Sequence, residues 1–247
     1  MSNALVVILV IIIVCCMIYP KHKPIHKPIH KSIPTPKSIL KSVPKSASIS
    51  IPKPKPVLNK KQKIYLDIVK KTKVALDRLN IPFFLSSGTC LGYFREGKFI
   101  DHDYDIDVGI FKENYSDKIT KEMEKEGLTL YRTWGDLDTG LELSFMLKGT
   151  SLGKSAKIDI FVHYKDDKHV SWYSYSPSKK RLHYRVSKFD IKNVNFMGVI
   201  VGVPNPTLTY IEEHYGKDWK IPKKPFIDYK YYSDPISLVK DKKLVKK

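Results

Sequence analysis

The chain opens with a continuous run of apolar positions. Residues 4–19 read ALVVILVIIIVCCMIY. This run is slightly shorter than the roughly 20 residues that span a bilayer comfortably. It lacks the basic segment and the small-residue cleavage site of a secretory signal peptide. We therefore expect residues 1–20 to be the N-terminal transmembrane anchor of a single-pass membrane protein, which contacts the membrane through residues 4–19. The side of the membrane on which the rest of the chain lies is left open.

Residues 21–59 show neither helical nor strand periodicity. Nine of the chain's sixteen prolines lie between Pro20 and Pro56, and the segment contains the repeat HKPIHKPIHKSI. Such a composition cannot build a packed core and favours extended, polyproline-like conformations. We expect a disordered, Lys/Pro-rich stem that acts as a spacer. Attraction of the stem to anionic lipid or polymer is the alternative.

Regular periodicity begins near Lys60. Apolar residues at helical spacing predict an amphipathic helix over 64–79, which Asn80 and Pro82 end. Ser116 is expected to cap a second amphipathic helix that ends at Glu126. The pattern also predicts strands over 83–87, 104–110, 128–133, 141–147, 156–164 and 170–175, and short helices over 89–96 and 208–214. Because these elements do not alternate strictly as β-α-β, we expect an α+β domain over 60–232, in which helices flank a mixed β-sheet.

The positive charge of the chain is unevenly distributed. The formal net charge is +19, yet twelve lysines and no acidic residue lie between Lys21 and Lys63. Residues 240–247 add a further +4, so only +3 remains for the middle of the chain. The basic character therefore belongs to the stem and to a C-terminal tail over 233–247. A nearly neutral body argues against nucleic acid as a partner.

Candidate chemistry is concentrated around two aspartates. Asp105 and Asp107 are two positions apart on an expected strand, so both carboxylates point to one face while Ile106 and Val108 point to the other. Two neighbouring carboxylates repel each other unless a cation neutralises them or they share a proton. Hard oxygen ligands at this spacing suit Mg²⁺ or Mn²⁺. An acidic surface loop is the alternative interpretation.

Three further features strengthen the metal interpretation. Asp159, in the segment KIDIF, would be a third ligand if its strand lay beside that of Asp105 and Asp107; an exposed strand edge is the alternative. The turn at Gly88 and Thr89 precedes a helix, whose N-terminal N–H groups can hold a phosphate. Arg95 could pair with a phosphate through its planar guanidinium, although a lone arginine is more often a surface residue.

Two separated blocks resemble a known family. The segment GTCLGYFREGKFIDHDYDID, residues 88–107, resembles the signature of the LicD and fukutin group, and residues 203–222, VPNPTLTYIEEHYGKDWKIP, resemble that family's closing motif. The likeness extends over roughly residues 62–225. It departs from many bacterial members at Tyr104, where they carry an aspartate, and it retains Asp103.

The resemblance implies a fold, an activity and roles for the site residues. It implies a nucleotidyltransferase-like fold and transfer of phosphocholine or ribitol phosphate from a CDP-alcohol donor to a glycan acceptor. Gly88, Thr89, Arg95 and Asp103 would then contact the substrate. Asp105, Asp107 and Asp159 would be the catalytic and metal-binding carboxylates, with Asp159 as third ligand or as base. The alternatives are a nucleotidyltransferase that acts on a small molecule or RNA, and an inactive, glycan-binding member.

Overall fold

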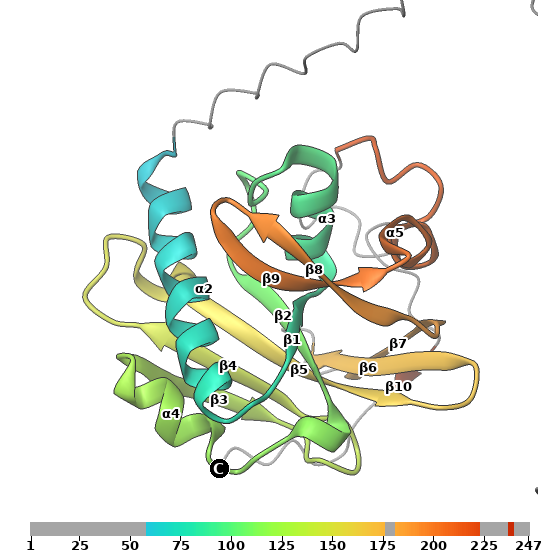
Figure 1. Ribbon diagram of the computed structural model, residues 1–247, viewed down its shortest axis with the longest axis horizontal. Coiled ribbons are helices and arrows are strands. Elements are labelled where there is room, and N and C mark those ends of the chain that lie inside the picture. Colours follow the sequence, from blue (N-terminus) through green and yellow to red (C-terminus); the bar gives the residue numbers. More distant parts are fainter. Residues whose placement is uncertain (1–57, 176–180, 223–236, 240–247) are drawn as a thin grey trace, which may run out of the picture. The chain divides into compact units, whose positions relative to one another are not determined.

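The computed structural model describes residues 58–175, 181–222 and 237–239, and these form a layered α/β body (Figure 1). The expected anchor over 1–20 and nearly all of the expected stem lie outside the described residues. Within the described part of the chain, no helix combines the length and the apolar character needed to cross a bilayer.

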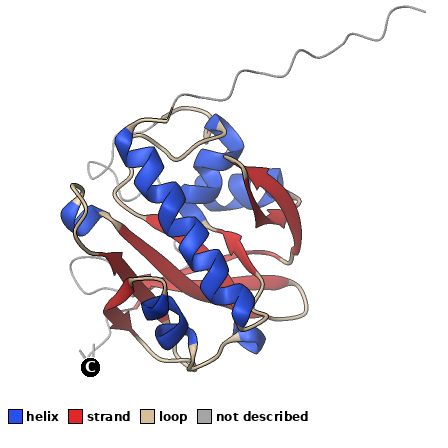
Figure 2. Cartoon of the chain, turned by 60° about the vertical axis from the view of Figure 1, so that its left-hand side comes forward, coloured by secondary structure: helices blue, strands red, loops and turns tan. Residues whose placement is uncertain are grey.

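Helix α2, Lys60–Arg78, begins where the pattern predicted the folded body to begin. The side chain of Asn59 caps it by accepting a hydrogen bond of 2.9 Å from the backbone N–H of Gln62. Its apolar stripe, which includes Tyr65, Ile68 and Leu76, is completely buried. α2 packs beside α4, Ile119–Lys125, on one face of the sheet (Figure 2).

The start of α4 corrects one expectation. The helix begins at Ile119, three residues after Ser116, and Ser116 does not cap it. The Ser116 hydroxyl instead accepts a hydrogen bond of 3.2 Å from the N–H of Lys118, in a turn that precedes the helix. Short serine side chains bond readily to nearby backbone groups in turns as well as at caps, so the residue type alone did not locate the helix start.

The described strands form one mixed sheet in the order β10-β7-β6-β5-β2-β1-β9-β8. The expected mixed sheet flanked by helices is therefore confirmed. The β3–β4 hairpin branches from β5, and the neighbours β2/β5 and β1/β9 run parallel while the other pairs run antiparallel. The strands are β1 (Phe83–Leu85), β2 (Ile106–Phe111), β3 (Leu128–Trp134), β4 (Glu142–Leu147), β5 (Lys157–Lys165), β6 (His169–Tyr175), β7 (Arg181–Ser187), β8 (Asp190–Phe196), β9 (Val199–Asn205) and β10 (Ser237–Val239).

Four of these strands were not anticipated. β7, β8 and β9 follow β6, and β10 lies within the segment expected to be a basic tail. β8 is mostly exposed, so it lacks the alternation that marks a half-buried strand. It is held by antiparallel pairing with β9. The turn that joins the two strands contains Gly198, whose φ is 93°.

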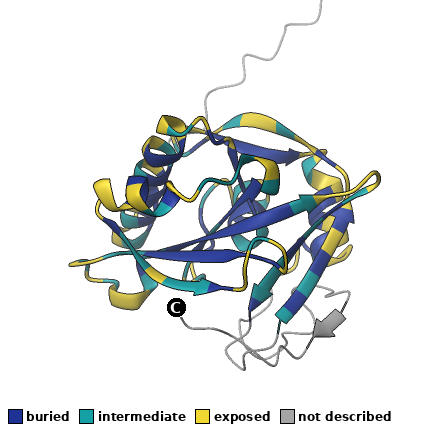
Figure 3. Cartoon of the chain, turned by 90° about the horizontal axis from the view of Figure 1, so that it is seen from below, coloured by how far each residue is buried: buried dark blue, intermediate teal, exposed yellow. Residues whose placement is uncertain are grey.

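The sheet divides along one edge of β5. The first half of that edge pairs with β4, and the second half pairs with β6. β6 then continues past the start of β4, and the backbone N–H of Tyr175 donates to the carboxylate of Glu142. Buried residues are concentrated on the central strands, whereas exposed residues cover the outer surfaces of the helices (Figure 3). The division places polar side chains from β3, β4 and β6 at the same end of the sheet as the aspartates.

Candidate active site

The central parallel strands bring the predicted carboxylates together. Asp107 on β2 lies directly opposite Asp159 on β5 in the strand register, so the expected neighbour relation is confirmed. Asp105 comes just before β2, and Asp103 lies in the loop that leads to it. Asp103, Asp105 and Asp107 each present a carboxylate oxygen, and the three oxygens lie within 4.8 Å of one another. This group therefore includes Asp103, which the sequence interpretation had placed with the substrate contacts.

Helix α3 comprises Ser87–Glu96. The turn that joins β1 to this helix holds Asp107 in position. The N–H of Gly88 donates to Asp107 Oδ2 at 3.0 Å, and the N–H of Asp107 donates to Thr89 Oγ1 at 2.8 Å. A Cβ atom on Gly88 would lie 2.5 Å from Asp103 Oδ2, so only glycine fits without a shift. Gly88 and Thr89, expected to contact the substrate, both contact Asp107; Gly88 lines the cavity, whereas Thr89 is buried and is absent from the described lining residues.

Helix α5 comprises Thr207–Tyr215, and its Tyr210 stabilises the same turn through hydrogen bonds. Its hydroxyl accepts a hydrogen bond of 3.0 Å from the N–H of Ser87 and lies 3.1 Å from the Ser86 hydroxyl. Ser87 has a φ of 40°, a left-handed conformation that is uncommon outside glycine. The closing sequence block therefore contributes a polar contact to the site, in addition to the packing that the sequence suggested.

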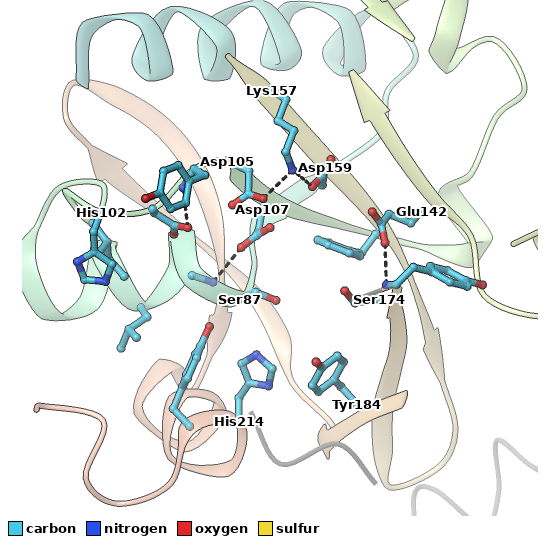
Figure 4. Close-up of a pocket in the computed structure, with 18 of the residues that line it drawn as sticks. Ser87, His102, Asp105, Asp107, Glu142, Lys157, Asp159, Ser174, Tyr184 and His214 are labelled. Atoms are coloured by element: carbon cyan, nitrogen blue, oxygen red, sulfur yellow. Dashed lines mark hydrogen bonds and ion pairs between the residues drawn. The ribbon is translucent and has the colours of Figure 1, made fainter. Parts of the chain in front are cut away.

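Lys157 is a site residue that the sequence analysis missed. Its ammonium group lies 2.6 Å from Asp105 Oδ2 and 2.6 Å from Asp159 Oδ2, and it joins the two carboxylates (Figure 4). The signal was present in the alternation of KIDIF, which puts Lys157 and Asp159 on the same face of β5. The second oxygen of Asp159, Oδ1, is buried and has no hydrogen-bond partner within the described part of the chain.

Two of the carboxylates, those of Asp103 and Asp107, have raised pKa values and resist ionisation. Burial, together with the charge of Asp105, raises the pKa of Asp103 to about 8. Burial and the charges of Asp105, Asp103 and Asp159 raise the pKa of Asp107 well above its usual range. Burial would lower the pKa of Lys157, but the charges of Asp159 and Asp105 outweigh that effect and raise it. The oxygen donors and their excess negative charge fit a hard divalent cation.

Arg95 does not lie with these residues. Its guanidinium group contacts Glu96 Oε1 at 2.7 Å and the backbone oxygen of Trp219 at 3.2 Å. Arg95 is absent from the described residues that line the cavity. In the structure it joins the end of α3 to the segment after α5. The arginine that faces the cavity is Arg132 of β3, a position that carries no recognisable sequence signal.

The aspartates line a cavity of about 500 Å³. Besides the carboxylate cluster and Lys157, a second polar wall consists of Arg132, Glu142 and Ser174. Aromatic side chains from β7 and α5, Tyr184 and His214, approach the cavity from the side opposite α2 (Figure 4). The lining residues are Ser87, Gly88, Leu91, Ile100, His102, Asp103, Tyr104, Asp105, Asp107, Arg132, Glu142, Lys157, Asp159, Phe161, Ser174, Tyr175, Tyr184, His214 and Tyr215.

The fold and the site together define a class of protein. A mixed sheet carries clustered aspartates on adjacent parallel strands, beside a glycine turn that opens a helix, and this arrangement suits a domain that handles phosphate-bearing substrates. The family model described as "LicD/FKTN/FKRP, nucleotidyltransferase domain" matches residues 80–206, just over half of the chain. The chain belongs to this family, and the resemblance read from the two sequence blocks is confirmed.

Curated relatives agree with this family. "Ribitol-5-phosphate transferase FKTN" of Macaca fascicularis is 39% identical over 167 residues, which cover 67% of this chain and 34% of that protein. The Homo sapiens protein of the same name is 38% identical over 167 residues, with the same shares of 67% and 34%. The uncharacterized Caenorhabditis elegans protein T07A5.1 is 36% identical over 89 residues, covering 35% of this chain and 23% of its own. The chain thus spans about a third of the length of the transferases it matches.

Among solved structures, the chain is similar to a solution structure of the antibiotic-resistance factor ANT(2'')-Ia. The sequence identity is 15%, the TM-score is 0.43, and the match covers 69% of this chain and 82% of the other. At that TM-score the likeness carries no argument about fold or function.

Proposed function

We propose that this protein is a metal-dependent phosphotransferase that moves a phospho-alcohol, of the ribitol phosphate or phosphocholine type, from a CDP-activated donor to a glycan. One observation carries the proposal: the carboxylates of Asp103, Asp105 and Asp107 converge beside Gly88 at a cavity, with Asp159 on the adjacent strand. The names of the macaque and human relatives support the transfer of ribitol phosphate.

In this proposal Mg²⁺ or Mn²⁺ is held by Asp105 and Asp107, with Asp159 as the third ligand or as the base. Asp103, whose carboxylate belongs to the same cluster, completes the acidic side of the cavity. A bound cation would offset the charge of the donor diphosphate and of the leaving nucleotide. Gly88 and Thr89 keep Asp107 aimed at the cavity through the two hydrogen bonds described above.

The transfer itself exchanges one P–O bond for another. The acceptor hydroxyl oxygen forms a bond to the phosphorus that carries the alcohol, and the bond from that phosphorus to the bridging oxygen breaks, so that CMP leaves. If Asp159 is the base and not the third ligand, its Oδ1, which has no hydrogen-bond partner among the described residues, takes the proton of the acceptor hydroxyl. Residues 4–19 would anchor the protein in a membrane, and the stem would let the catalytic body reach its acceptor.

The test uses the full chain with Mn²⁺, CDP-ribitol and a glycan acceptor, and measures CMP release together with the mass of the product. Asp107→Asn removes one negative charge at constant shape, so CMP release should fall by orders of magnitude, because the metal's electrostatic contribution is several kcal/mol. Asp117→Asn, an exposed position outside the cavity, is the matched control and should keep parental activity.

Two results would contradict the proposal. Full CMP release by Asp107→Asn would show that this carboxylate is not part of the catalytic machinery. Nucleotide binding by the parent without CMP release from any CDP-alcohol would identify the chain as an inactive, binding member of the family.

A further inference from the structure

The cavity has a second polar wall that the proposed metal site does not use. Glu142 of β4, Arg132 of β3 and Ser174 of β6 line it, at the point where the sheet divides along β5. In the view of Figure 4, Glu142 and Ser174 lie on the side of the cavity away from His102, with the aspartates between them. Every group on this wall comes from a strand, so its position is set by strand pairing.

The Glu142 carboxylate is buried, and its ion pair with Arg132 is long. Its side chain is 3% exposed, and Oε2 accepts one hydrogen bond of 3.2 Å from the N–H of Tyr175. The other oxygen, Oε1, lies 3.6 Å from Arg132 Nη2, which is too long for a hydrogen bond. Burial and the charge of Asp159 raise the pKa of Glu142. A carboxylate in such surroundings is costly unless another group completes its hydrogen bonds.

The guanidinium of Arg132 is held in place beside that carboxylate. Its central carbon lies 4.9 Å from the centre of the Trp134 ring, and Trp134 stacks on Tyr175 at 5.5 Å. The register of β3 against β4 shifts between Leu130 and Arg132, a bulge that changes the direction of the side chains after it. Arg132 Nε is buried and has no hydrogen-bond partner among the described residues. Both members of the pair therefore have capacity for a ligand.

The opposite charges of Glu142 and Arg132 determine which kind of ligand can bind between them. Glu142, with Asp159 nearby, repels an anion, and Arg132 repels a cation. A hydroxyl group satisfies both, because it donates a hydrogen bond to a carboxylate and accepts one from a guanidinium. Two adjacent hydroxyls of a sugar or an alditol can do so together.

We propose that Arg132 and Glu142 form the acceptor subsite, which binds adjacent hydroxyl groups of a neutral saccharide next to the carboxylate cluster. This inference deepens the proposed function, on which its assignment to the acceptor rests. The carboxylate and the guanidinium that would bind the saccharide belong to β3 and β4, and neither is among the residues proposed to hold the metal.

The test measures binding of the full-chain protein, in Mn²⁺, to an array that displays neutral and acidic saccharides at equal density. Parent protein should bind neutral saccharides in preference to acidic ones. Glu142→Gln and Arg132→Lys should each weaken that binding about tenfold, the effect of losing one charge-assisted hydrogen bond. Glu113→Gln, an exposed glutamate outside the cavity, is the matched control and should bind as the parent does. Thermal melts identify any variant that fails to fold, in which case the other variant decides.

Three outcomes overturn the subsite: no binding of neutral saccharides, preference for acidic ones, or binding that both cavity variants retain. CMP release from CDP-ribitol, measured on the same parent sample and on Asp107→Asn, reports separately on the proposed function. If the parent releases CMP normally but does not prefer neutral saccharides, only the subsite proposal is overturned. Absence of CMP release, with neutral saccharide binding that depends on Glu142, removes the catalytic proposal and leaves the subsite standing.

Discussion

Replacing Lys157 with methionine should show how far its positive charge offsets the negative charge of the neighbouring aspartates. The ammonium group of Lys157 lies 2.6 Å from both Asp105 and Asp159, and its side chain is only 17% exposed. Methionine keeps most of the aliphatic length and removes the charge. The variant therefore leaves several carboxylates without their nearest cation, in a region where burial and mutual repulsion already raise the pKa values of Asp103 and Asp107.

The magnitude follows from how far each pair is buried. Asp159 is 6% exposed, and removing one partner of a buried pair costs about 3–5 kcal/mol. Asp105 is 28% exposed, so its pair is screened and contributes less than about 1 kcal/mol. We expect Lys157→Met to lower the free energy of unfolding by about 3 kcal/mol in metal-free buffer. For a domain of this size that corresponds to a fall in melting temperature of about 6–12 °C.

A divalent cation should reverse the defect. At one hundred times its dissociation constant, a ligand that binds only the folded state adds about 2.7 kcal/mol. Because Lys157 would compete with the proposed cation for Asp105 and Asp159, Mn²⁺ should raise the melting temperature of Lys157→Met more than that of the parent. The assay is thermal melting of the full chain with EDTA and with Mn²⁺. Lys112→Met removes an exposed pair of 3.1 Å with Asp138 and should cost less than about 1 kcal/mol.

Two results would refute this reasoning. If Lys157→Met melts at the parental temperature in EDTA, Lys157 does not offset the charge of the carboxylates. If Mn²⁺ shifts the parent and Lys157→Met equally, the cation and the ammonium group do not share a site.

Three further predictions concern other parts of the molecule. Lys61 donates hydrogen bonds to the backbone oxygens of Asp101, at 2.8 Å, and Asp103, so Lys61→Met should loosen that loop and weaken Mn²⁺ binding several-fold by calorimetry, while Lys61→Arg restores it. Burial lowers the pKa of His163 to about 3. Below about pH 6.5 the unfolded chain therefore binds a proton at this histidine that the folded chain does not, and between pH 7 and pH 5 the parent should lose about 2 kcal/mol of stability relative to His163→Gln in urea unfolding. Parallel pH profiles of the two proteins would disprove this. Deleting residues 4–19 should move the protein out of the membrane fraction, and retention there would show that the anchor lies elsewhere.

The sequence by itself determined the elements whose residues are constrained locally. The helix over α2 followed from apolar spacing, and its end followed from Asn80, which takes a φ of 54°. Side-chain alternation placed Asp105 and Asp107 on one face. The apolar residues on either side of Asp159 likewise identified the strand β5. Two blocks in the right order were sufficient to recognise the family: the first contains the turn and the clustered aspartates, and the second contains Tyr210, which contacts that turn.

Tertiary structure decided what depends on partners far along the chain. Arg95 looked like a phosphate ligand by its distance from the turn, yet the fold directs it to the Trp219 backbone oxygen, 124 residues away. Lys157 joins Asp105 across 52 residues of sequence. Glu142 and Arg132 meet through the β3–β4 pairing with its register shift, and Ser174 joins them only because β4 and β6 share one edge of β5. Local patterns report the periodicity of one element, whereas the charge and shape of a cavity depend on which elements pair and in which register, and that is settled by packing of the whole sheet.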